Sequence, residues 1–90
     1  MTLRDLTPQM AERLDMPRGS KGVVVMDVEA GEAAEEAGLQ RGNVIVSVNG
    51  QAVEGVGDFE RLIDAARRDG RARLRVRTEQ GFFVAVLKLK

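Results

Sequence analysis

The segment AGLQRGNVIVSVNG, residues 37–50, decides the fold of this ninety-residue chain. Gly38 is predicted to end a short alanine-rich helix over residues 31–37, because glycine adopts the positive φ of a helix C-terminus without steric cost. The apolar run Val44–Val48 predicts a buried strand. Asn49-Gly50 is the strongest dipeptide signal for a two-residue hairpin turn. A helix, a strand and a tight turn are therefore expected within fourteen residues.

Further strands are predicted on both sides of this segment. Gly22–Val28 is β-branched and nearly continuously apolar, which is typical of a strand buried on both faces. Arg71–Arg77 alternates arginine with apolar residues and predicts a strand with one solvated face. A turn at residues 79–81 should lead into a last strand, whose inward face would consist of Phe83, Ala85, Leu87 and Leu89. The alternation in residues 1–6 is a weaker strand signal.

Two more helices are predicted. Thr7 is expected to cap a helix that has Pro8 at its first position and ends before Pro17 and Gly19. A longer helix is expected from an Asp58 cap to about Asp69. Its apolar side chains recur at i, i+3, i+4 and i+7 and would form one buried stripe: Phe59, Leu62, Ile63 and Ala66.

These elements predict an α+β domain. Five or six short strands and two or three helices in ninety residues suggest a small, partly open antiparallel barrel or sandwich capped by helices. We expect one domain over residues 1–90, because no linker or internal repeat divides the chain. The longest apolar run, residues 82–87, is far too short to cross a membrane, so no membrane insertion is expected.

Composition excludes several kinds of active site. The chain has no histidine and no cysteine, which removes Ser-His-Asp and Cys-His arrangements and the usual zinc sites. No metal and no cofactor is therefore expected. An enzyme that uses carboxylates such as Glu35, Glu36 and Asp64 has little support. Glu35 and Glu36 are adjacent on a short helix, so their side chains diverge by about 100°. The chain is expected not to be an enzyme by itself.

Residues 37–50 contain, in order, AGL, two residues, G, N, an apolar strand and NG. This ordered set resembles the most recognisable segment of PDZ domains. Asn43 stands where that family usually has aspartate. The segment KGVVVMDV (21–28) and the helix that begins near DFERLI (58–63) are similar to PDZ domains of the bacterial Do-like (HtrA/Deg) serine proteases. LTPQMAERLDMP (6–17) is most similar to their second PDZ domain. The resemblance covers essentially the whole chain and implies the circularly permuted bacterial form of the PDZ-like fold, with the last strand at the chain's end.

The resemblance implies a peptide-binding module. PDZ domains add an extended peptide to a sheet edge beside a helix, here between strand 1–6 and helix 58–69. Backbone hydrogen bonds supply affinity, and pockets for alternate side chains supply selectivity. The peptide-binding residues that the resemblance implies are Met1, Thr2, Leu3, Arg4, Leu6, Asp58, Leu62, Ala65 and Ala66. The family's carboxylate-binding x-Φ-G-Φ loop should precede the first strand, and only its last apolar position can correspond to Met1.

The resemblance also implies the setting of the domain. The parent would be a periplasmic serine endopeptidase whose catalytic triad lies outside this chain. The expected partners are unfolded or C-terminal peptide segments of substrates, the protease domain and neighbouring PDZ domains. Two alternatives stay open: an assembly or regulatory domain without a free peptide ligand, and a structural role for the groove residues. In the second, Leu3, Leu62 and Ala65 are core residues and Asp58 is only a helix cap.

The net charge of zero is divided unevenly along the chain. Residues 1–60 carry five basic and eleven acidic groups, and residues 61–90 carry nine basic and three acidic groups, which gives −6 and +6. The row Arg71, Arg73, Arg75 and Arg77 could contact phosphates. However, Phe82 and Phe83, the aromatic residues nearby, are expected to be structural, which leaves none for base stacking. A solvated strand face is favoured, and no nucleic-acid binding is expected.

Overall fold

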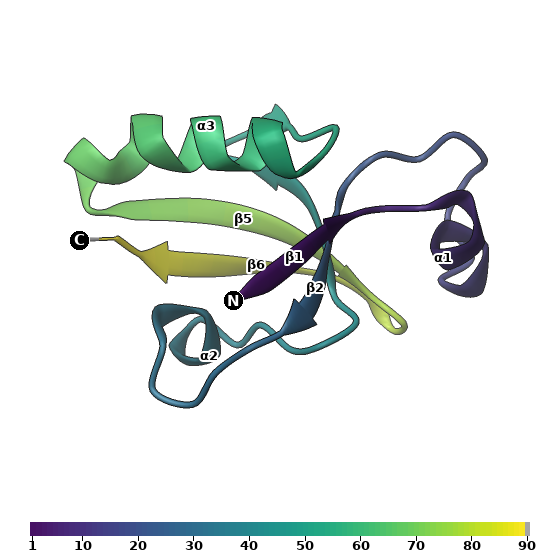
Figure 1. Cartoon of the computed structure of the whole chain (residues 1–90), viewed down its shortest axis with the longest axis horizontal. Coiled ribbons are helices and arrows are strands. Elements are labelled where there is room, and N and C mark those ends of the chain that lie inside the picture. The colour runs from purple at the N-terminus through teal and green to yellow at the C-terminus, as the bar shows by residue number, and fades with distance from the viewer. Residues whose placement is uncertain (90) are drawn as a thin grey trace.

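The computed structural model describes residues 1–89. Its strands and helices follow one another along the chain in the order drawn in Figure 1: β1 (Thr2–Asp5), α1 (Pro8–Arg13), β2 (Val23–Asp27), α2 (Ala33–Glu36), β3 (Val44–Val48), β4 (Gln51–Ala52), α3 (Val56–Ala66), β5 (Arg71–Thr78) and β6 (Gly81–Lys88). A short 3₁₀ turn, Arg67–Asp69, connects α3 to β5. The predicted α+β class and the predicted element order are both observed.

All strand pairs of the sheet are antiparallel. The strand order is β1-β2-β3-β5-β6, with β4 paired to β3 beside this path, so β1 and β6 are the two ends of the order. Figure 1 shows β1 and β2 running across the direction of the long β5–β6 hairpin. In the same view, α3 lies along one side of the hairpin and α2 along the other.

The core forms where the central strands meet α3. Val23, Val25, Ile45, Leu74 and Val76 are fully buried at 0% exposure. Burial of one such side chain contributes roughly 1.5–3 kcal/mol. The helix adds the predicted stripe, in which Phe59, Ile63 and Ala66 are buried and Leu62 is half-buried. The alternation predicted for β5 is also observed, since Ala72, Leu74 and Val76 face inward.

The tight turn after β3 is anchored to β5. Asn49 and Gly50 both have positive φ, 49° and 82°, as the Asn-Gly dipeptide predicts. The Arg73 backbone N–H donates to Asn49 Oδ1 at 2.8 Å, and the Asn49 N–H donates to the Arg73 carbonyl at 2.7 Å. The turn therefore fixes the position of the β3–β4 hairpin on the neighbouring strand.

The helix boundaries differ in places from the prediction, and α2 covers only Ala33–Glu36 of the predicted residues 31–37. Helix α3 begins at Val56 with Gly55 as its N-cap, so Asp58 lies in the first turn and is not the cap. The Asp58 carboxylate instead accepts the Glu54 backbone N–H at 3.1 Å. Helix α1 has the predicted Thr7 cap, which accepts from Met10 N–H at 3.2 Å, but it ends at Arg13. The chain already turns left-handed two residues after Arg13, where φ is 56°.

Candidate functional site: the groove between β1 and α3

Strand β1 has a partner on one side only. It pairs with β2, and within residues 1–89 β2 is its only neighbour in the strand order. Just beyond β1, the Leu6 N–H donates to the Gly22 carbonyl at 3.0 Å. Successive residues of a strand turn their N–H and C=O groups to opposite sides. The backbone groups of Leu3 and Asp5 therefore point toward the free edge, where another strand could pair.

Apolar side chains of β1 and α3 lie on the same part of the core. Among the partly buried side chains that pack against the one core cluster are Met1 just before the strand, Leu3 in it, and Val56 and Leu62 from the helix. Strand and helix also contact one another directly. The structure thus brings three of the predicted site residues, Met1, Leu3 and Leu62, onto one apolar floor.

The other predicted site residues of these two elements differ in exposure. Thr2, Arg4 and Ala65 are exposed, whereas Asp58 is half-buried. Ala66 is 3% exposed and belongs to the core cluster. Thr2, Arg4 and Ala65 are therefore open to solvent, while Ala66 is part of the core.

A hydrogen bond joins β1 to the start of α3. Asp5 Oδ1 accepts the Val56 N–H at 2.8 Å, although the two residues are 51 positions apart. The N-cap residue of α3, Gly55, has no side chain to satisfy that donor. A Cβ atom at Gly55 would lie 2.8 Å from Asp5 Oδ1, so a larger residue there would push the carboxylate away from the Val56 N–H. This contact fixes the spacing between β1 and α3 at one end of the groove.

Sequence reasoning did not single out Asp5. Its role follows from a tertiary contact, and the only signal in the sequence was a helix start that lacks a serine, threonine, aspartate or asparagine at the N-cap. Asp58, which was predicted to be that cap, makes local contacts. Arg61 Nη2 donates to Asp58 Oδ1 at 2.7 Å. This guanidinium, together with the Glu54 N–H, holds the pKa of Asp58 below its usual value.

The opposite end of β1 lies beside the start of α2. The terminal ammonium of Met1 is 3.0 Å from Glu32 Oε1. The same carboxylate oxygen accepts the Glu29 N–H at 3.3 Å. The ammonium group first, and then the Glu29 N–H, lower the pKa of Glu32. The Asp5 hydrogen bond to the Val56 N–H holds the other end of β1.

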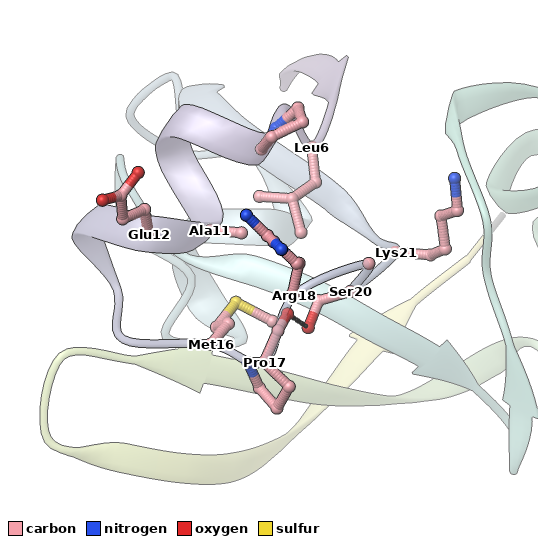
Figure 2. A pocket seen from close by; sticks show the side chains of 10 residues that line it. Leu6, Ala11, Glu12, Met16, Pro17, Arg18, Ser20 and Lys21 are labelled. Atoms are coloured by element: carbon pink, nitrogen blue, oxygen red, sulfur yellow. Dashed lines mark hydrogen bonds between the residues drawn. The ribbon is translucent and has the colours of Figure 1, made fainter.

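Leu6 belongs to a different hollow. It lines a depression of about 380 Å³ beside α1, together with Met16, Pro17 and Arg18. Figure 2 shows Leu6 above Arg18, with Glu12 and Lys21 extending away from the centre of the hollow. Leu6 therefore lies just past the end of β1, where the chain enters this hollow.

Comparison with known proteins agrees with this architecture. The sequence model of the family described as "PDZ domain" matches residues 24–78. This chain belongs to the PDZ domain family. The chain is 42% identical over 69 residues to a protein named "Probable periplasmic serine endoprotease DegP-like" from Brucella suis, a match that covers 73% of the chain and 14% of that protein. Its counterpart from Chlamydia pneumoniae is 27% identical over 88 residues, covering 98% of the chain and 17% of the relative.

A solved structure has the same fold. The crystal structure of the HtrA3 PDZ domain bound to a phage-derived ligand (FGRWV) superimposes with a TM-score of 0.78. The two chains are 23% identical, and the match covers 98% of this chain and 79% of that one. The predicted PDZ-like fold is confirmed, and the domain is a module of the peptide-binding type. No helix in residues 1–89 is long and apolar enough to cross a membrane.

Proposed function

We propose that this PDZ domain binds extended peptide segments, including C-terminal ones, by strand addition to β1 in the groove beside α3. The observation that carries the proposal is the free edge of β1, where the backbone groups of Leu3 and Asp5 have no strand partner. An added strand would satisfy these groups with hydrogen bonds that do not depend on the ligand's sequence. Affinity would therefore come first from the backbone.

Selectivity would come from the side chains on either side of the edge. Met1 and Leu3 would contact the last ligand side chain, with Leu62 and Ala65 opposite. The partly buried, flexible Met1 suits a roomy apolar pocket. Further ligand contacts along the edge, on the helix and beyond the strand are proposed for Thr2, Arg4, Asp58 and Leu6, and Ala66 is proposed to support the site from within the core.

The wider role follows from the relatives. Proteins that share this domain are named periplasmic serine endoproteases, and this chain spans 14–17% of the length of two of them. We propose that residues 1–90 form one PDZ domain, of the kind found second in such proteases, in a longer periplasmic serine protease. In that setting it delivers unfolded or C-terminal peptide segments to the protease domain, or regulates it together with neighbouring PDZ domains.

An NMR titration of the ¹⁵N-labelled chain tests peptide binding. The first probe is the pentapeptide FGRWV with a free terminal carboxylate, which is the ligand named for the HtrA3 domain. Amide shifts are expected in residues 2–6 and 58–66. Leu62→Lys should abolish them, whereas Val84→Lys, a matched change on the exposed outer face of the sheet, should not. If a panel of peptides with free apolar C-termini leaves both segments unshifted, the groove is not a peptide site, and an assembly role is favoured.

A further inference from the structure

The solvent face of the β5–β6 hairpin has an unusual apolar row. The large apolar side chains found exposed in residues 1–89 are Phe82, Val84 and Val86, at 51%, 63% and 49%. All three stand at alternate positions of β6 and share one face of that strand. Phe82 was expected to be structural, but it points outward, while Phe83 is half-buried on the inner face. An exposed row of this kind commonly marks an interaction site.

An arginine row runs beside the apolar row. The strand register places Arg77 opposite Phe82, Arg75 opposite Val84 and Arg73 opposite Val86. Arg71 continues the row at its end. Within the part of the chain that the structure describes, the ion pairs join other residues, so Arg71, Arg73 and Arg75 have no carboxylate partner within 4.0 Å. Cationic and apolar side chains therefore form two parallel lines on one face.

The geometry of Phe82 decides which kind of partner fits. The guanidinium groups of Arg75 and Arg77 lie 4.5 and 5.1 Å from the centre of its ring. Arg77 is also held by a 3.0 Å hydrogen bond to the Leu14 carbonyl. Two cations therefore already lie against the ring, where a nucleic-acid base would have to stack.

We propose that this hairpin outer face, formed by Arg71, Arg73, Arg75, Phe82, Val84 and Val86, docks an acidic protein segment in which carboxylates alternate with aliphatic side chains. The charge of the face is complementary to such a segment, because planar guanidinium groups bind carboxylates in a bidentate manner. Alternate residues of a strand are spaced by roughly 6.7 Å, which is also the spacing of carboxylates at every second position of an extended partner. The aliphatic side chains between them would cover Val84 and Val86.

This inference is independent of peptide binding in the groove. The groove lies at β1, at one end of the strand order, and the hairpin outer face lies at β5 and β6, at the other. The arginine row alone would be an ordinary solvated face. The exposed valines and Phe82 beside it distinguish this face, because a strand that only needs to be soluble does not require them.

The test is an NMR titration with the peptide EVETEVE, acetylated and amidated so that it offers no terminal carboxylate to the groove. Shifts are expected in residues 71–78 and 81–88 and should weaken as the salt concentration rises. R73Q/R75Q should lower the affinity about five- to tenfold, the effect of two partly exposed charge contacts. R18Q/R41Q changes the net charge equally elsewhere on the surface and should change the affinity less than twofold. V84T/V86T keeps every charge and should also weaken binding.

Other outcomes would overturn the proposal. Shifts in residues 1–6 and 56–66 would assign the acidic peptide to the groove. Equal losses in the two arginine variants would show attraction to the overall charge without a site. No shift at millimolar peptide and low salt would remove the docking surface. Preferential binding to vesicles that contain phosphatidylglycerol, or self-association that R73Q/R75Q abolishes, would assign the face to a membrane or to a second copy of the chain.

Discussion

Removal of the Asp5 carboxylate should destabilise the domain and loosen the groove together. Asp5→Ala leaves the Val56 N–H, now bonded at 2.8 Å, without its acceptor. Loss of a helix cap costs about 1 kcal/mol, with a range of roughly 0.5–2. A carboxylate at an exposed helix N-terminus adds roughly 0.3–1 kcal/mol through the helix dipole. Because Asp5 is exposed, we expect a total loss of about 1–1.5 kcal/mol in the free energy of unfolding.

Urea unfolding at neutral pH measures this loss. Asp5→Asn keeps an acceptor and removes the charge, so it should cost about half as much. Asp27→Ala is the matched control, since Asp27 is an exposed aspartate in β2 with no side-chain hydrogen bond or ion pair among the contacts of the described residues. In the same variants, the affinity for FGRWV should fall with Asp5→Ala and stay unchanged with Asp27→Ala, because only the first frees α3 from β1.

A double-mutant cycle separates the bond from a general effect of charge. Gly55→Ala places a Cβ 2.8 Å from Asp5 Oδ1 and must displace it. In the wild-type background this change should be destabilising, and in the Asp5→Ala background most of its cost should disappear. Additive costs, or a loss in Asp5→Ala no larger than in Asp27→Ala, would refute the idea that Asp5 caps α3.

Three further perturbations test local features of the fold. Arg61→Gln should raise the pKa of Asp58 toward its usual value, as measured by ¹³C NMR titration. In the wild type, the Asp58 carboxylate should stabilise the fold at pH values above its unfolded-state pKa. This stabilisation should be lost as the pH falls through the lower folded-state pKa. An unchanged pKa would contradict this ion pair. Asn49→Ala should lower the free energy of unfolding in urea by about 1–2 kcal/mol, because it forces alanine into positive φ and leaves the Arg73 N–H without its acceptor. A decrease below about 0.5 kcal/mol would show that the turn does not depend on the Asn49 side chain. Gly22→Ala should lower the melting temperature, since its Cβ would lie 2.8 Å from a β3 valine and 3.0 Å from a β3 carbonyl, and a neutral effect would mean that β3 can shift.

The elements that were predicted well are those with local signals. Gly38 has φ of 88° and ends its helix as expected, because the conformation depends on that residue alone. The alternation in residues 71–77 predicted the inward face of β5, since a strand's period of two fixes which side chains share a face. Such signals need no knowledge of distant parts of the chain.

The features that were missed depend on contacts between distant segments. Asp58 was expected to cap α3, and Asp5, 51 residues before Val56, performs this role. Leu6 was grouped with the groove, and the hollow beside α1 that it also lines was not predicted. Composition and spacing do not determine these positions, because each follows from how β1 crosses the rest of the molecule.

The interpretation of the arginine row changed for a similar reason. On its own strand, an arginine at every second position indicates only a solvated face. The register between β5 and β6 then places Val84 opposite Arg75 and Val86 opposite Arg73, so the two rows form one surface. The sequence contains both rows, but their adjacency depends on the two-residue turn at 79–80. A register shift of one residue would send Val84 and Val86 inward and remove the mixed face, so the proposed docking surface depends on this register.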